Sequence, residues 1–177
     1  MYKIRSKKIV LEKARLIKLI LLDVDGVLTN GDITYGKLND EEEPVEIKTF
    51  DVHDGYGIVK AFEKGLAVGI ITARNSKVVQ LRAEELGIND VYQGSFNKTE
   101  AYEDIKQKRK VNDSEVAYMG DDLFDLPVLQ KVGLSSAPST ARPEVKRKVD
   151  YITKAPGGKG AVREFIDLIF KAKGFIE

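Results

Sequence analysis

The sequence predicts an α/β fold of the Rossmann-like kind, with three layers and a mostly parallel sheet. Short apolar runs alternate with longer stretches of helical period, which is the pattern of parallel strands joined by crossover helices. One segment, 30–51, breaks this alternation and has the pattern of a β-hairpin inserted after the first strand. The chain has 177 residues and no repeat, linker or low-complexity tract, so we predict a single domain over 1–177.

The individual elements follow from the apolar patterning. Buried strands are predicted at 17–22, 66–71 and 115–119, with weaker ones near 91–92, 133–135 and 151–152. Helices are predicted at 55–64, 76–86, 98–110, 123–131 and 160–173. Gly65 and Gly87 stand where helix C-terminal caps are expected, because glycine adopts the left-handed conformation without steric cost.

The segment that breaks the alternation contains two short strand patterns. Residues 33–35 form the first, 37–44 a polar turn, and 45–50 alternate between apolar and polar side chains. An isolated two-stranded hairpin is only marginally stable in water. We therefore expect it to lie against its own domain or against another subunit.

Composition and charge exclude several classes of function. Hydrophobic residues make up 42% and charged residues 32%, and the net charge of +1 favours neither nucleic acid nor an acidic partner. The basic runs 106–110 and 146–148 lack interleaved aromatic residues, so they are interpreted as solvated helix faces. The absence of cysteine excludes disulfides, thiolate catalysis and a cysteine-based zinc site. Neither a membrane span nor a signal peptide is indicated, so we expect a cytoplasmic protein.

Four aspartates predict a magnesium site. Asp23 and Asp25 end the first strand two residues apart, so both can face the cavity at the carboxyl edge of the sheet. Asp121 and Asp122 follow the strand 115–119 at the same edge. Converging carboxylates repel each other unless a proton or cation intervenes, and an all-oxygen set suits Mg²⁺. The alternative is that each aspartate merely caps the helix that follows it.

Further polar residues near the same edge suit an anion. Thr72 can donate its hydroxyl and backbone N–H to a phosphate oxygen, although a threonine in this position is also a common helix cap. Lys98 opens a helix, where the dipole opposes a cation, and this conflict favours a functional role. Arg74 and Asn75 follow Thr72 in a loop suited to gripping a substrate anion, the alternative being a solvated arginine. His53 is the only histidine and has no part in the predicted mechanism.

These segments, in this order, resemble the phosphatases of the haloacid dehalogenase superfamily. The resemblance is carried by Asp-Val-Asp-Gly at 23–26, by Thr72, by Lys98 and by Gly-Asp-Asp at 120–122, with Asp125 behind. The intervals between these motifs hold little more than the hairpin and single helices, so the chain resembles the type without a separate cap domain.

The resemblance implies a role for each acidic residue. Asp23 would be the nucleophile that forms an aspartyl-phosphate, and Asp25 the acid that protonates the leaving group and then activates water. Mg²⁺ would be held by Asp23, the backbone carbonyl of Asp25 and Asp121, with Asp122 close by or acting through water. Asp125 would orient the lysine described next.

The resemblance also assigns the phosphate-binding residues. Thr72 and Lys98 would neutralise the oxygens of the transferring phosphoryl group. Arg74 and Asn75 are the candidates for substrate selection.

Several longer motifs narrow the resemblance to phosphatases of 3-deoxy-D-manno-octulosonate 8-phosphate, which act in lipopolysaccharide core synthesis. These are the segments 23–29, 50–57, 92–94, 118–123 and 157–164. Phosphatases of nine-carbon sugar acids or other small metabolites remain an alternative, as does a non-catalytic oligomeric domain. The resemblance further implies a homotetramer in which hairpins assemble a barrel and neighbouring subunits cover each site. The loop 157–160 is a candidate for reaching a neighbouring site.

Overall fold

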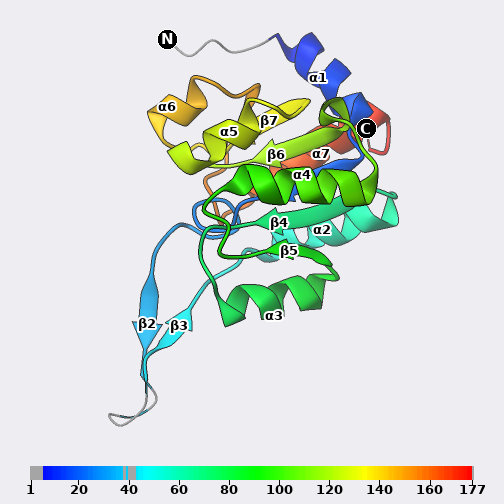
Figure 1. Cartoon of the computed structure of the whole chain (residues 1–177). Coiled ribbons are helices and arrows are strands. Elements are labelled where there is room, and N and C mark those ends of the chain that lie inside the picture. The colour runs from blue at the N-terminus through cyan, green and yellow to red at the C-terminus, as the bar shows by residue number, and fades with distance from the viewer. Residues whose placement is uncertain (1–5, 38, 40–42, 177) are drawn as a thin grey trace.

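The computed structural model describes residues 6–37, 39 and 43–176. Six parallel strands form one sheet in the order β5-β4-β1-β6-β7-β8 (Figure 1). Their bounds are β1 (Leu19–Leu22), β4 (Ala67–Ile71), β5 (Asp90–Tyr92), β6 (Val116–Met119), β7 (Leu134–Ala137) and β8 (Tyr151–Ile152). The central strand β1 is apolar and buried throughout, as both faces of a parallel sheet are covered. The predicted α/β fold with a mostly parallel sheet is confirmed.

Helices cover both faces of the sheet and create two apolar layers. The larger layer includes buried residues of four helices, which are α1 (Lys7–Leu16), α2 (Val52–Glu63), α3 (Lys77–Leu86) and α7 (Ala161–Lys173). The opposite layer includes α4 (Lys98–Arg109), α5 (Leu126–Leu129) and α6 (Pro143–Lys146). Alternate residues of β1 point into different layers, Ile20 and Leu22 into the first and Leu19 and Leu21 into the second. This gives the three-layer arrangement.

The predicted elements differ from the structure at several ends. The first strand starts at Leu19 rather than at residue 17, because Ile17 is the C-cap of α1. Helices α1 and α6 have no counterpart among the predicted elements. The predicted helix 123–131 is a 3₁₀ turn, Leu123–Asp125, followed by the short helix α5. Gly87 is the left-handed C-cap of α3, as predicted.

The inserted hairpin is present and extends away from the sheet. In Figure 1 the hairpin points away from the body of the molecule. Strands β2 (Thr34–Gly36) and β3 (Val45–Ile47) pair antiparallel, with Tyr35 opposite Glu46. Much of the predicted turn 37–44 lies outside the described residues. Four apolar side chains of this region are exposed, namely Ile33, Tyr35, Val45 and Ile47.

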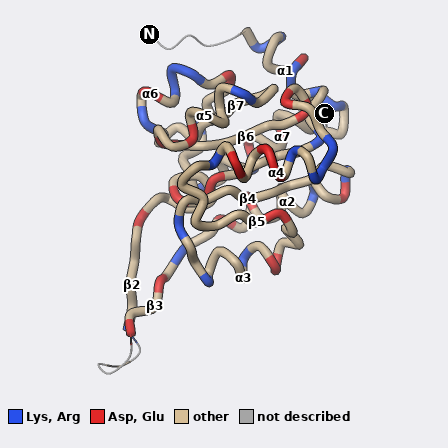
Figure 2. The backbone as a smooth tube through the Cα atoms, viewed as in Figure 1, with Lys and Arg blue, Asp and Glu red and all other residues tan. Residues whose placement is uncertain are grey.

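Acidic and basic residues are interspersed along the chain (Figure 2). Within the basic run 106–110, Lys106 pairs with Glu103 and Asp113 at 2.7 Å each, and Arg109 pairs with Asp90 at 2.5 Å. Such pairing supports the interpretation of this run as a helix face with its own counter-charges. Among the described residues, no helix combines the length and apolarity needed to cross a membrane.

Asp54 of α2 joins two helices of the larger layer. Its buried carboxylate accepts hydrogen bonds from the backbone N–H groups of Gly160, at 3.2 Å, and Arg163, at 2.7 Å. These groups belong to the first turn of α7 and its N-cap, which is a glycine without a side chain to cap the helix. Asp54 therefore caps α7 from a neighbouring helix. Burial raises the pKa of Asp54 to about 6 even though these N–H groups favour the carboxylate.

This raised pKa predicts a pH-dependent stability. The pKa of an unfolded aspartate is about 3.9, so the folded chain binds this proton more tightly. Stability that Asp54 contributes below pH ~4 is then lost as the pH rises to ~6. We expect the free energy of unfolding of the wild type to fall, relative to that of Asp54→Asn, over this interval. Urea denaturation across this pH range tests the predicted change in the free energy of unfolding, with the exposed Glu84→Gln as control. A constant difference between wild type and Asp54→Asn would contradict the assignment.

Candidate active site

The predicted site residues meet in an open cleft at the carboxyl edge of the sheet. The cleft has a volume of about 380 Å³, within the range of small-molecule sites. Its lining includes Asp23, Asp25, Gly31, Thr72, Ala73, Arg74, Phe96, Lys98, Asp121, Asp122, Phe124 and Asp125. Seven of the eight residues predicted for the site are in this set. The eighth, Asn75, is exposed and lies against Gly94.

Asp23 lies immediately after β1, and both of its carboxylate oxygens are held. Oδ1 accepts the backbone N–H of Val24 at 2.7 Å, and Oδ2 pairs with the Lys98 ammonium at 2.7 Å. Burial, and then the neighbouring Asp125 carboxylate, raise the pKa of Asp23 to about 7. Lys98 and the Val24 N–H act in the opposite direction without cancelling this rise. The carboxylate is thus held in place, and its ionised form is unfavourable unless a further positive charge lies nearby.

Lys98 bridges Asp23 and Asp125. Its side chain is 2% exposed, and its Nζ lies 2.7 Å from Asp125 Oδ1. The hydroxyl of Tyr118 donates to the same oxygen at 2.6 Å, while Asp125 Oδ2 accepts the N–H groups of Asp121 and Asp122. Asp125 thus contacts Lys98, and its role in orienting the lysine stays a prediction. Asp125 also connects the backbone of residues 121 and 122 to Lys98.

The carboxylates of Asp23, Asp121 and Asp125 form the acidic centre of the cleft. One oxygen of each lies within 4.8 Å of the others. Burial, followed by Asp23 and Asp125, raises the pKa of Asp121 to about 8. Three ionised carboxylates with the single cation Lys98 leave a double negative charge, which one divalent ion would compensate. An all-oxygen set of this kind fits Mg²⁺.

Two other aspartates predicted for the metal have different surroundings. Asp122 accepts the N–H of Leu123 at 2.6 Å and caps the 3₁₀ turn, while also lining the cleft. The Asp25 side chain is turned toward Lys48 and Arg74, and the metal prediction for this residue concerns its backbone carbonyl. Both assignments stay predictions.

Close backbone approaches bring the loops of the site together. Gly26 has a φ of +84°, and a Cβ atom there would overlap the Asp121 carboxylate. A Cβ atom on Gly157 would overlap the carbonyl oxygen of Gly26, and Gly158 N–H donates to Val27 O at 2.9 Å. The glycine-rich loop 157–160 therefore packs against the loop that follows β1 in its own chain.

Thr72 and Arg74 occupy the second wall of the cleft. Thr72 is buried at the end of β4, and its backbone N–H donates to the carbonyl oxygen of Tyr92 at 2.9 Å. That bond commits the N–H, so the hydroxyl is the group of Thr72 suited to a phosphate oxygen. Arg74 forms an ion pair with Glu46 at 2.9 Å and lies 3.7 Å from Asp25.

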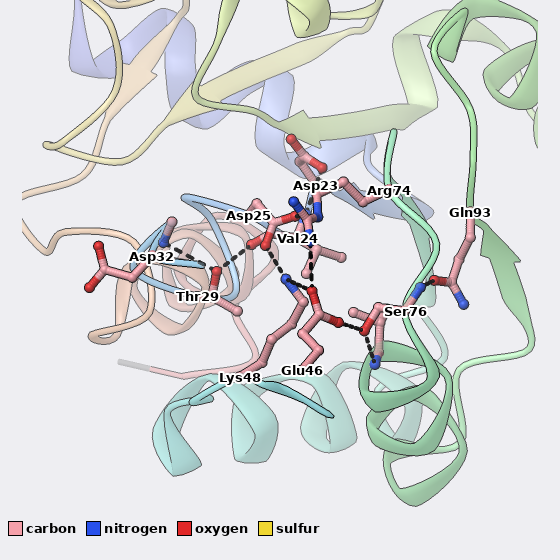
Figure 3. A network of polar contacts seen from close by, with 12 residues as sticks. Asp23, Val24, Asp25, Thr29, Asp32, Glu46, Lys48, Arg74, Ser76 and Gln93 are labelled. Carbon is pink, nitrogen blue, oxygen red and sulfur yellow. Dashed lines mark hydrogen bonds and ion pairs between the residues drawn. The ribbon is translucent and has the colours of Figure 1, made fainter. Parts of the chain in front are cut away.

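Several residues of the site have no counterpart among the predicted ones. Tyr118 lies within the predicted strand 115–119, but its hydrogen bond to Asp125 cannot be predicted from local sequence. Glu46 and Lys48 come from the hairpin and contact Arg74 and Asp25 (Figure 3). Their only sequence signal is a polar pair two residues apart within an alternating strand.

A model of the haloacid dehalogenase-like hydrolase family matches residues 67–166. The chain belongs to this family. It is 46% identical over 168 residues to 3-deoxy-D-manno-octulosonate 8-phosphate phosphatase of Escherichia coli K12, with 95% of this chain and 87% of that protein covered.

Solved structures of family members agree with the fold. The phosphatase of the same name from Yersinia pestis superposes with a TM-score of 0.89 at 42% identity, covering 94% of this chain and 87% of that one. The enzyme from Moraxella catarrhalis, crystallised in complex with magnesium, phosphate and KDO, gives a TM-score of 0.89 at 39% identity and covers 96% and 94%. The family and the fold class predicted from sequence are both confirmed.

Proposed function

We propose that this chain is a Mg²⁺-dependent phosphatase that hydrolyses 3-deoxy-D-manno-octulosonate 8-phosphate to the free sugar acid and phosphate. The observation that carries the proposal is the cluster in which Lys98 bridges Asp23 and Asp125 beside Asp121. The similarity to named phosphatases over 95% of the chain supports the choice of substrate. The product would enter lipopolysaccharide core synthesis.

The first half of the reaction transfers the phosphoryl group to the protein. One carboxylate oxygen of Asp23 attacks phosphorus, and the bond between phosphorus and the sugar oxygen breaks. The electron pair stays on that oxygen, which takes a proton from Asp25. Lys98 and the Thr72 hydroxyl stabilise the charge on the transferring group.

The second half regenerates the enzyme. Asp25, now a carboxylate, accepts a proton from water while the water oxygen attacks phosphorus. The bond between phosphorus and Asp23 breaks, and inorganic phosphate and the Asp23 carboxylate are released. Mg²⁺ held by Asp23, the Asp25 carbonyl and Asp121, with Asp122 nearby, would neutralise phosphate charge during both halves.

Phosphate release from a panel of sugar phosphates tests the function. The panel contains eight- and nine-carbon sugar-acid phosphates and simple hexose phosphates, each assayed with Mg²⁺ and with excess chelator. We expect a strong preference for 3-deoxy-D-manno-octulosonate 8-phosphate and loss of turnover with chelator. Preference for a nine-carbon substrate would reassign the substrate, and equal rates across the panel would indicate a general phosphatase. Lack of turnover with Mg²⁺ would contradict the enzyme function.

The proposal includes a cytoplasmic homotetramer. The absence of cysteine suits a reducing compartment. The cleft is open on the described chain, and the hairpin carries exposed apolar side chains that association would bury. Pairing of hairpins between subunits would cover these side chains and screen the cleft from water.

Charges on the hairpin should disrupt this assembly. We expect the double substitution Val45→Asp and Ile47→Asp to dissociate the tetramer, because both side chains are about half exposed and would face a partner. Sedimentation velocity measures the mass of the species. Ile9→Asp on α1, at similar exposure, is the control and should leave the mass unchanged. A tetramer that persists in the double variant would contradict the role given to the hairpin.

A further inference from the structure

We propose that Lys48 and Glu46 are positioning residues for Asp25 and Arg74, so that the hairpin is a working part of the active site of its own chain. The inference depends on the proposed phosphatase function and extends it. It assigns to the hairpin a second role, distinct from association between subunits.

Lys48 holds the carboxylate of Asp25. Its Nζ forms an ion pair with Asp25 Oδ1, across 23 positions of sequence, and its side chain is only 2% exposed (Figure 3). The other oxygen, Asp25 Oδ2, lies 3.7 Å from Arg74 Nε. Cations from two separate elements thus flank the carboxylate and define its orientation.

Glu46 holds both of those cations. Its Oε1 accepts from Arg74 Nη2 at 2.9 Å and lies 3.4 Å from Lys48 Nζ. Its Oε2 accepts a hydrogen bond from the Ser76 hydroxyl, and Ser76 is also the N-cap of α3. The Ser76 N–H in turn donates to the Gln93 side chain at 2.7 Å. The hairpin is therefore tied to the N-terminus of α3 and, through Ser76, to the residue that follows β5.

The strand geometry explains why these two residues act together. Side chains two positions apart in a strand project from the same face, so Glu46 of β3 and the following Lys48 both project toward Asp25 and Arg74. Val45 and Ile47 project from the opposite face, where they are exposed. One face of β3 therefore serves the chain's own site and the other is free for a partner.

The burial of Lys48 favours a role through Asp25 over direct contact with the substrate. Among the described residues that line the cleft, Asp25 and Arg74 are present and Lys48 is not. Its ammonium is paired with the carboxylates of Asp25 and Glu46. Loss of this cation would leave Asp25 and Glu46 to share Arg74, and the weaker compensation would let the Asp25 side chain turn away from the leaving oxygen. Misplacement of a reacting group by about 1 Å costs up to ~10²-fold in rate.

The test compares two leaving groups. The C8 oxygen of the sugar acid needs a proton as it leaves, whereas p-nitrophenolate leaves readily without one. We expect Lys48→Met to lower kcat/KM for the sugar-acid phosphate by ~10²-fold, and for p-nitrophenyl phosphate by less than about threefold. Lys48→Arg should restore part of the activity on the sugar substrate. The exposed Lys37→Met, on the same hairpin, is the matched control and should change neither value.

A double variant gives a second, independent measurement. If Lys48 acts through Asp25, Lys48→Met should cause little further loss on the sugar substrate in an Asp25→Asn background. If the wild type turns over normally, equal losses on both phosphate esters, or additive losses in the double variant, would overturn the inference. An inactive wild type would instead contradict the proposed function. Circular dichroism and the melting temperature verify that each variant is folded.

Discussion

Replacement of Asp23 by asparagine is expected to abolish turnover and leave the fold intact. The amide has the size of the carboxyl but cannot attack phosphorus, so kcat/KM should fall by at least ~10⁴-fold. Asp23 is buried among other carboxylates, and its pKa is raised to about 7. Removing its charge therefore relieves repulsion, and the melting temperature of Asp23→Asn without metal should be equal to or higher than that of the wild type.

Three measurements check this prediction. Phosphate release gives the rate, thermal denaturation gives the stability, and mass spectrometry after acid quenching detects a phosphoryl group on the peptide that contains Asp23. Asp32→Asn, at an exposed position of the following loop, is the control and should retain activity and the phosphorylated intermediate. An unchanged rate in Asp23→Asn, or a phosphoryl group found on another residue, would contradict the aspartyl-phosphate mechanism.

Replacement of Lys98 by methionine should cost both activity and stability. Loss of a preorganised group that stabilises transition-state charge lowers kcat by ~10²–10³-fold. The substitution also leaves Asp23 and Asp125 buried without their cation, and removal of one partner of a buried pair costs about 3–5 kcal/mol. The loss of stability should shrink as the pH falls, because protonation of the carboxylates removes their repulsion.

The matched control for this prediction is Lys77→Met. Lys77 is the first residue of α3 as Lys98 is of α4, but it is exposed. Its substitution should leave activity and the free energy of unfolding nearly unchanged. Adding Asp23→Asn to Lys98→Met should restore part of the lost stability, since one uncompensated charge is removed. If Lys98→Met lost no more stability than Lys77→Met, the electrostatic role of Lys98 in the folded chain would be contradicted.

The sheet could be predicted from local sequence because each of its main strands is marked by a short apolar run. Apolar runs such as 66–71 are followed by glycine, threonine or aspartate, and these polar or small residues mark where the strands stop. Helix α1 was not predicted because half of its ten residues are charged and only Val10 and Ala14 are buried. The segment 123–131 has the apolar content of a helix, but Asp122 and Asp125 use their side chains to fix a 3₁₀ turn first.

The candidate site was predictable to the extent that its residues stand at strand ends. Asp23, Thr72 and Asp121 follow parallel strands, so the topology alone brings them to one edge of the sheet. Lys98 was recognisable because a cation at a helix N-terminus conflicts with the helix dipole. Asn75 was placed with Arg74 by adjacency, yet the backbone turns between them and leaves its side chain exposed against Gly94.

The sequence by itself determined the chemistry of this protein, because the order of its acidic, hydroxyl and lysine residues along parallel strands dictates which groups converge. Only the tertiary structure decided how those groups are held. Lys48 reaches Asp25 from 23 positions away, and Tyr118 shares Asp125 with Lys98. Such contacts depend on the packing of distant segments, and no local period or spacing encodes them.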